Sequence, residues 1–368
     1  MRMYNNVRLF DVLTRHQIYV EGVKAQHARE FNNVLRELQV EFNTLFARLR
    51  FQTLDGLTKA ALRSFLIDLR DVQGRVYNAY TTKLIEQLQE FMRADIRVSK
   101  VIFATIQKPE GEDETPVDED EADAALEDAY DNNEGSNLYP LIWFKSAHNG
   151  GDSSKLWSSI TNAPIPANGV LLLPFIAGFA ASASTSVENI VRKGYANRSS
   201  VEAVLAEIVG TKAKNFRDGS FSRINSQAGA VTATAIQHVT SVTQAGIASI
   251  FFGRYRWVSV IDNATTEICK GRNGRIFRYG EGPLPPAHIR CRSKTVPVVS
   301  GDNSTPPSSY HAWMNSQPSG VQDDIMGAQK ASDLRSGKIK AKDMPQFDEV
   351  NPLTVEGFVS KLNQILTR

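Results

Sequence analysis

The stretch Ile224–Gly253, INSQAGAVTATAIQHVTSVTQAGIASIFFG, runs for 30 residues without an Asp, Glu, Lys or Arg. Many Asn, Gln, Ser and Thr side chains interrupt it, which argues against a membrane-spanning segment. A helix without charge on any face is normally enclosed by protein on most sides. We therefore expect this stretch to form the central helix of its domain or a subunit interface, with His238 as a hydrogen-bonded core residue.

Two long helices are expected upstream of this stretch. Within residues 11–50, and again from Thr58 to Leu88, apolar side chains recur every three or four positions, the spacing of one stripe along a helix. Turn residues at 53–56 separate the stripes, which predicts an antiparallel helical hairpin over residues 1–108. Periodicity leaves open whether this hairpin belongs to a compact bundle or forms an extended arm that docks a partner.

The segment between Glu110 and Glu134 contains 13 acidic residues and no Lys or Arg, so a total charge of +2 leaves +15 on the rest of the chain. Large apolar side chains are scarce there, which predicts a mobile acidic linker over residues 109–137. A basic chain with one acidic segment suggests a polyanionic partner. The acidic segment would either shield the basic surface or compete with that partner for it. A solvated loop without a partner is the other interpretation.

The composition of the whole chain, with 368 residues of which 42% are hydrophobic and 22% charged, suits a globular protein of two or three domains. Two cysteines exclude a disulfide-dense secreted scaffold, and the first residues lack the apolar region of a signal peptide. These features favour a reducing compartment such as the cytosol.

The remaining chain divides by pattern into a helical core domain at 138–253, a β-rich module at 254–300 and a C-terminal tail with short helices at 301–368. In the core domain, Ser186 and Ser200 resemble helix caps because a Glu follows each in the first turn. The predicted fold class is α+β, predominantly α. It combines the hairpin, the helical core, a small β-rich Cys/His module and an irregular to helical tail.

The module at 254–300 alternates β-type runs with turn residues. Strands are expected at Arg254–Val260, Arg275–Tyr279 and Thr295–Val299, with a turn at Asn273–Gly274. The prolines at 283, 285 and 286 forbid regular structure before His288. The sequence therefore predicts a small, loop-rich β unit.

Both cysteines of the chain lie in this module, at positions 269 and 291, and His288 lies three residues before the second. A small unit with little core often needs a cross-link or a metal. Two thiolates and an imidazole are natural zinc ligands, and Asp262 is the nearby carboxylate for a fourth position. Three interpretations stay open: a zinc site at Cys269, His288, Cys291 and Asp262, a Cys269–Cys291 disulfide, or two buried thiols beside a hydrogen-bonding histidine. Zinc is the one cofactor that these residues imply.

Basic residues outnumber acidic ones over most of the module, with nine Lys or Arg against three Asp or Glu in residues 254–294. Such side chains neutralise phosphates, and the interleaved Tyr255, Trp257, Phe277 and Tyr279 can stack on exposed bases. The predicted nucleic-acid-binding residues are Arg254, Arg256, Lys270, Arg272, Arg275, Arg278, Arg290, Arg292 and Lys294. The other interpretation is a basic surface that pairs with the acidic segment or with another protein.

The module resembles the signature of phage Mu F-like head morphogenesis proteins, also called minor capsid proteins. The stretch 285–292, PPAHIRCR, matches the second half of that signature. Thr266 and Ser293 stand where the family pattern has two further cysteines. Residues 185–253 and 310–338 look like the family's flanking segments, whereas 1–140 carry no such likeness. The matching residues are Trp257, Asp262, Thr265, Cys269, Gly274, Pro285, Pro286, His288, Cys291, Arg292 and Pro297.

The resemblance implies a structural protein of a tailed bacteriophage head, associated with the portal or the capsid interior. It implies partners among the portal and other head proteins, several copies per virion, and non-specific contact with double-stranded DNA during packaging or ejection. It places the protein in the virion, and in the host cytoplasm during assembly, without a membrane partner. The alternative hypothesis is a stand-alone nucleic-acid-binding protein or nuclease.

No enzymatic activity is expected from the residues themselves. The Gly271–Gly274 stretch lacks the Lys-Ser/Thr ending of a phosphate-binding loop. A Cys/His hydrolase needs a thiolate, an imidazole and an orienting group in contact, whereas a turn after Pro-Pro more often fixes geometry.

Overall fold

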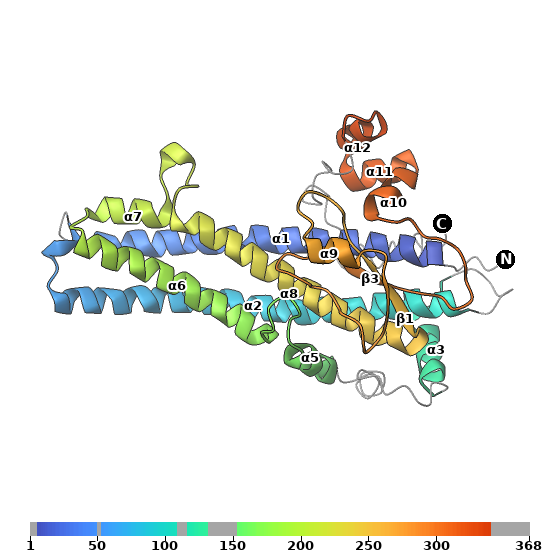
Figure 1. Ribbon diagram of the computed structural model, residues 1–368. Coiled ribbons are helices and arrows are strands. Elements are labelled where there is room, and N and C mark those ends of the chain that lie inside the picture. Colours follow the sequence, from blue (N-terminus) through green and yellow to red (C-terminus); the bar gives the residue numbers. More distant parts are fainter. Residues whose placement is uncertain (1–5, 50–52, 109–115, 132–152, 340–368) are drawn as a thin grey trace. The chain divides into compact units, whose positions relative to one another are not determined.

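The computed structural model describes residues 6–49, 53–108, 116–131 and 153–339 (Figure 1). The protein is predominantly α-helical with one small antiparallel sheet, which confirms the predicted fold class. The helices are α1 (Asn6–Ala47), α2 (Lys59–Gln107), α3 (Glu119–Asp131), α5 (Ser153–Asn162), α6 (Leu172–Ala196), α7 (Val201–Val209), α8 (Ser220–Phe251), α9 (Glu267–Arg272), α10 (Tyr310–Ser316), α11 (Ser319–Met326) and α12 (Ala328–Arg335). The strands are β1 (Arg254–Val258), β2 (Ile276–Arg278) and β3 (Lys294–Pro297).

The chain forms two compact units, and each combines stretches that are distant in sequence. Unit 1 contains Met1–Ala25, Leu88–Leu172 and Ala233–Arg368, and unit 2 contains Gln26–Gln87 and Leu173–Thr232. The five consecutive segments expected from composition do not follow this division. Residues 340–368 of the expected tail, and 109–115 and 132–137 of the expected linker, lie outside the described residues.

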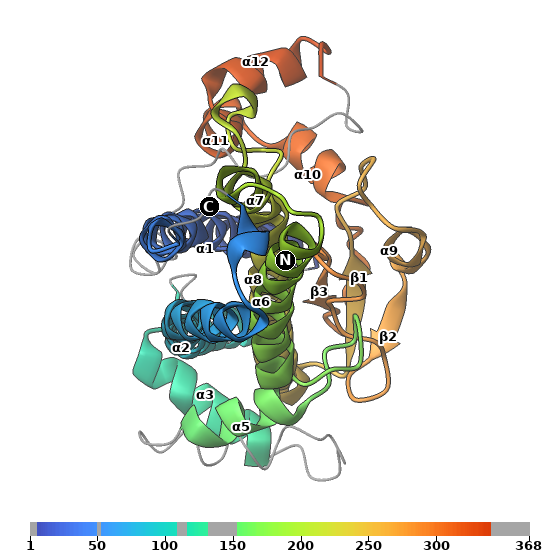
Figure 2. The ribbon, with the colours of Figure 1, turned by 90° about the vertical axis from the view of Figure 1, so that its left-hand side faces the viewer.

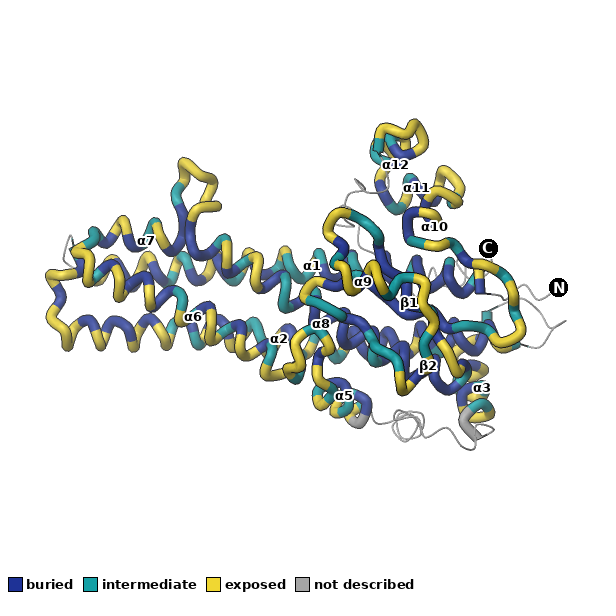
Figure 3. Tube along the Cα trace, viewed as in Figure 1, coloured by how far each residue is buried: buried dark blue, intermediate teal, exposed yellow. Residues whose placement is uncertain are grey.

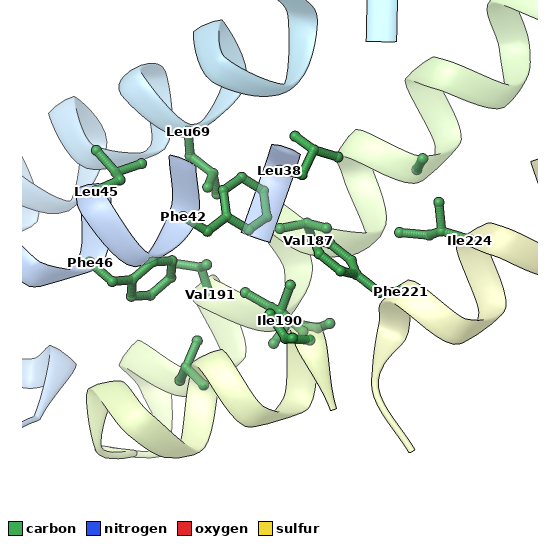
Figure 4. Close-up of a cluster of buried hydrophobic side chains, with 14 of the residues drawn as sticks. Leu38, Phe42, Leu45, Phe46, Leu69, Val187, Ile190, Val191, Phe221 and Ile224 are labelled. Carbon is green, nitrogen blue, oxygen red and sulfur yellow. The ribbon is translucent and has the colours of Figure 1, made fainter. Parts of the chain in front are cut away.

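Unit 2 is a helical bundle around one apolar core (Figure 4). The two predicted stripes of α1 and α2 supply much of it, and they pack together with α6, α7 and the first part of α8. Aromatic rings interlock edge to face, with centroids 5.5 Å apart for Phe31 and Phe179 and 5.0 Å apart for Phe46 and Phe65. Residues 26–87 of the hairpin therefore belong to a bundle, which was the first of the two interpretations.

One of the two predicted helix starts is correct. Ser200 caps α7, because its hydroxyl accepts a hydrogen bond from the backbone amide of Ala203. Ser186 instead lies inside α6, and its hydroxyl donates to the carbonyl of Ser182 one turn earlier. The same Ser-x-Glu pattern therefore occurs in this chain both at a cap and inside a helix.

The prediction of a linker without regular structure is wrong for Glu119–Asp131, which form α3. Ala122 and Leu126 are one turn apart and buried, while most of the acidic side chains between Asp118 and Asp128 are exposed. Lys100 of α2 forms an ion pair with Asp123. A short amphipathic helix thus needs only a few apolar positions, which the total composition of the segment conceals.

In unit 1, the second half of α8 is buried along its length although it carries many polar side chains. Several of its polar groups are paired with neighbouring helices, as most buried polar groups are. Thr240 donates to Asp95 of α2 at 2.6 Å, and Gln244 hydrogen-bonds His16 of α1 at 2.8 Å. His238 hydrogen-bonds the carbonyl of Ile160 at 3.0 Å, which confirms the expected core role. Among the described helices, none is both long and apolar enough to cross a membrane.

The module predicted at 254–300 forms a three-stranded antiparallel sheet in the order β2-β1-β3 (Figure 2). Tyr255 lies opposite Phe277 of β2 and Pro297 of β3, and Trp257 lies opposite Thr295. The three strands lie where the alternating pattern placed them, within two residues at each end. The short helices expected after residue 301 are present as α10, α11 and α12.

We predict that Phe42→Ala lowers the free energy of unfolding by about 3–5 kcal/mol, because it leaves a cavity in the core of unit 2. Phe42 is fully buried, whereas Val40 on the same helix is 66% exposed. Val40→Ala is the matched control and should change stability by less than about 0.5 kcal/mol. Urea unfolding followed by circular dichroism measures both, and equal effects would contradict the assignment of this core.

Candidate metal centre and basic surface

The two cysteines, which are 22 positions apart, meet in the core of the module. Cys269 lies on α9 and Cys291 lies in the loop before β3, and their sulfur atoms are 3.8 Å apart. Both residues are buried, at 1% and 0% exposure, and they pack with Trp257 of β1. Both thiols are free, and their separation is far above the ~2.05 Å of a disulfide bond. The module therefore closes on itself and brings its two halves together.

His288 completes a group of three metal-ligand residues, and we refer to Cys269, His288 and Cys291 as the Cys/His group. Their ligand atoms all lie within 4.8 Å of one another, so the group can hold a metal ion. Nδ1 of His288 hydrogen-bonds the carbonyl of Ile289 at 2.9 Å. A ring nitrogen engaged in this way leaves Nε2 available as a ligand, the usual arrangement of metal-binding histidines.

The pKa values of the three side chains in the Cys/His group are shifted in different directions. A hydrogen bond from Cys269 lowers the pKa of Cys291 against the effect of burial, and His288 and backbone amides act in the same direction. The pKa of Cys269 is correspondingly raised, first by that hydrogen bond and then by burial. The hydrogen bond to Cys291 also raises the pKa of His288, although burial opposes it. The contact with Cys269 and the neighbouring His288 thus act together to hold the pKa of Cys291 below its usual value.

Two hydroxyl side chains, those of Thr266 and Ser293, lie near Cys269. They occupy the positions at which the Mu F-like pattern has cysteines. Ser293 and Thr266 both lower the pKa of the Cys269 thiol, against the stronger opposing effects of Cys291 and burial. Ser259 connects the group, because its hydroxyl lies 2.9 Å from Oγ of Ser293 and donates to the carbonyl of Cys269 at 3.0 Å. The indole of Trp257 donates to the same hydroxyl. The role of Ser259 had no signal in the sequence.

Asp262 is not part of the Cys/His group, which corrects the predicted fourth ligand. Both carboxylate oxygens of Asp262 accept hydrogen bonds at 2.7 Å from the guanidinium of Arg292. The carboxylate also accepts hydrogen bonds from the Thr265 hydroxyl and the Ala264 amide, so it holds the turn that follows β1. A carboxylate held in this way by a two-pronged arginine contact stabilises the fold of the module.

Two helices outside the module hold the chain on either side of Cys291. Lys24 of α1 donates to the carbonyl of Cys291 at 3.4 Å, and it also contacts Glu21 and Gln237. The hydroxyl of Thr234 on α8 accepts from the amide of Arg290 at 3.0 Å. The Cys/His group is therefore positioned by the helical core of unit 1 and not by the module alone.

The nine predicted nucleic-acid-binding residues have very different exposures. Arg254, Lys270, Arg275, Arg278 and Arg290 are exposed, and Arg256 and Arg272 are half-buried. Arg272 stacks over the ring of Trp257, and Arg292 is engaged by Asp262.

Lys294 is buried, which corrects its assignment as a phosphate contact. Its ammonium group contacts the hydroxyl of Thr14 and lies 5.1 Å from the ring centroid of Phe10, both on α1. Burial lowers the pKa of Lys294 well below its usual value. The alternation of β3 placed this lysine on the side of the strand that packs against α1.

The basic residues that reach the surface include one ordered set, which we call the arginine face: Arg254, Arg256 and Arg278. Arg254 and Arg278 are direct partners across the antiparallel β1–β2 pair, and Arg256 lies two residues along β1 on the same side of the sheet. Like charges directly opposite each other are destabilising. An anion bound between them removes this repulsion.

Three of the four aromatic residues interleaved with these arginines are buried and not available to stack on bases, contrary to the prediction, whereas Phe277 is half-buried. Tyr255 and Trp257 are fully buried and Tyr279 is 4% exposed. They alternate with the arginines along the strands and therefore point into the module, where Tyr255 packs on Phe277 and Tyr279. Their role is the hydrophobic core of this small unit.

Comparisons of the chain with protein-family models, with curated proteins and with solved structures each gave no match.

We predict that Asp262→Asn lowers the free energy of unfolding by about 3–5 kcal/mol at pH 7, because Arg292 then stays buried without its charge partner. Burial opposes ionisation of Asp262, but the hydrogen bonds and charge of Arg292 outweigh it and hold its pKa below the usual value. The stabilisation is therefore complete above the unfolded value of about 4 and is lost as the pH falls through the lower folded value.

Urea unfolding of the wild type and of Asp262→Asn at pH 7 and pH 3 tests this dependence. The difference between the two proteins should shrink at the lower pH. Glu267→Gln is the control, because the Glu267 side chain is 88% exposed and its ion pair with Lys270 contributes little. A difference that stays constant between the two pH values would contradict the ion pair.

Proposed function

We propose that this protein is a structural component of a tailed-phage head, a minor head protein that contacts DNA through its Cys/His module. The closure of the stretch from Trp257 to Pro297, with Cys269 and Cys291 3.8 Å apart, is the observation that supports this proposal. The resemblance to Mu F-like head proteins lies in this stretch and requires its two halves to come together. A large distance between these two halves would have removed that support.

Zinc is the metal that suits the Cys/His group. Two thiolates bound tetrahedrally to zinc at about 2.3 Å lie about 3.8 Å from each other, the separation found between Cys269 and Cys291. Nε2 of His288 supplies the third ligand, and a solvent molecule or the Ser293 hydroxyl is suited to the fourth position. Bound zinc would supply a cross-link between α9 and the loop before β3, in a unit whose own core is small.

The arginine face is the surface that we assign to DNA. It combines three cations on one side of the β1–β2 pair, and the neighbouring Tyr255 and Trp257 are buried. Phosphate contacts of this kind are independent of sequence and weaken steeply with salt. Non-specific binding of double-stranded DNA is the expected result, in packaging or in ejection.

The module is proposed to act by binding and not by catalysis. The activated thiolate of Cys291 resembles a nucleophile, but its side chain has no exposed surface through which a substrate could reach it. Among the described residues, the Cys/His group is the one cluster of three or more metal-ligand residues. A nuclease of the two-metal type needs a carboxylate cluster that this part of the chain does not show.

The proposed partners are the portal and other head proteins, in several copies per virion. Co-sedimentation of the protein with procapsids and portal from infected cells tests this location directly. Recovery in virions or procapsids supports the proposal. Absence from both kinds of particle would overturn it, whatever the DNA-binding result.

We predict that reduced, purified protein contains about one zinc per chain, measured by elemental analysis. Cys269→Ser should lose the metal, because it removes one of two thiolates. Ser293→Cys should raise zinc affinity by roughly tenfold or more, because it places a third thiolate beside Cys269. A folded, reduced wild type that takes up no zinc from a buffered solution would contradict the site.

We predict that the Arg254→Ala/Arg278→Ala variant binds duplex DNA more weakly in a gel shift. The slope of log K against log salt should become shallower by about 0.9 for each phosphate that the variant no longer neutralises. Lys59→Ala/Arg63→Ala removes the same charge from an exposed stretch of α2 and is the matched control. Equal weakening in both variants would show that net charge, and not the arginine face, is responsible.

A further inference from the structure

The loop between α7 and α8, GTKAKNFRDG at residues 210–219, is closed at its base by two glycines. A Cβ atom on Gly219 would lie 2.2 Å from the backbone nitrogen of Gly210. A Cβ atom on Gly210 would lie 2.8 Å from Cα of Phe216, and Gly210 also has a positive φ of 98°. Only glycine allows the two arms of this loop to approach so closely.

Hydrogen bonds hold the loop in one conformation. The carbonyl of Thr211 accepts from the amide of Lys214 at 3.1 Å and from that of Phe216 at 2.9 Å. The carboxylate of Asp218 accepts from both the amide and the hydroxyl of Thr211, each at 2.7 Å. The loop is therefore a defined protrusion of unit 2, and Figure 1 shows it standing away from α7 and α8.

The backbone at the tip of the loop is strained. Asn215 and Phe216 are consecutive residues with positive φ, 50° and 58°. Asparagine tolerates this region, but a bulky residue such as phenylalanine rarely occupies it. Strain of this kind persists where the surrounding structure enforces it, and it is concentrated at functional sites.

The strained conformation presents an aromatic ring to solvent among positive charges. Phe216 is 47% exposed, and Lys212, Lys214 and Arg217 are also exposed. Figure 3 shows the exposed colour over the whole outer part of the loop. Three cations and one ring within six residues, on a rigid loop, form a surface suited to a ligand that offers both charge and an aromatic face.

We propose that the Gly210–Gly219 loop is a binding site for single-stranded nucleic acid, an inference that rests on the proposed contact of this protein with DNA. A strand offers unpaired bases and flanking phosphates in alternation, so Phe216 stacks on a base while Lys212, Lys214 and Arg217 contact phosphates. An acidic protein surface would use the charges but leave the ring in water. The arginine face contacts duplex, and the loop contacts unpaired strand.

Fluorescence anisotropy with a labelled oligo-dT and with a duplex of equal length tests this site in the full-length protein. Phe216→Ala should weaken binding of oligo-dT by about tenfold, the usual effect of losing one stacked base, and leave duplex binding within about twofold. Phe216→Tyr should restore oligo-dT binding. Ala213→Ser is the matched control in the same loop, and circular dichroism verifies that every variant is folded.

The two proposals fail in different ways. Oligo-dT binding that is unchanged in Phe216→Ala overturns the loop site, even if duplex binding depends on Arg254 and Arg278. Duplex binding that is unchanged in the arginine variant overturns the arginine face, even if Phe216 controls oligo-dT binding. If the loop variants bind both DNAs normally but no longer associate with procapsids, the partner of the loop is a protein and the nucleic-acid site is rejected.

Discussion

The enclosure of α8 is the constraint on which the structure of unit 1 depends. A helix surrounded by protein satisfies most of its polar side chains internally, because a buried polar group left unpaired is costly. Partners are therefore needed at matching heights on the neighbouring helices, and they are His16 and Gln17 of α1 and Asp95 of α2. Each such pair fixes the register of two helices, because sliding one helix past the other would leave several buried groups unpaired at once.

The same helices that satisfy α8 also position the Cys/His module. Lys24 contacts Gln237 of α8 and the backbone carbonyl of Cys291, so one side chain joins α1, α8 and the loop before β3. Lys294, three residues after Cys291 at the start of β3, makes a second connection to α1, where its amine contacts Thr14. The module is thus an extension of the polar core, and its ligand geometry inherits the rigidity of the helices.

The long helices and the strands of the module could be predicted from sequence, because periodic apolar positions and an absence of charge report burial directly. The helix in the acidic segment could not be predicted in this way. Composition indicated a linker, but α3 forms there and buries only a few apolar side chains, among them Ala122 and Leu126. Asp262 and Lys294 were misjudged for one shared reason. Their chemistry suits a metal and a phosphate, but each is used by a partner, Arg292 or Thr14, that lies far away in sequence.

The seven residues from His288 to Lys294 serve four separate neighbours. His288 and Cys291 face α9, Arg292 holds Asp262, Ser293 meets Ser259, and Lys294 enters the packing against α1. Of these seven, only Ile289 and Arg290 are exposed. Substitution is therefore tolerable at those two places, whereas inserting or deleting a single amino acid would displace every later side chain from its neighbour. Across related sequences, this stretch should vary in identity at its exposed positions and stay constant in length.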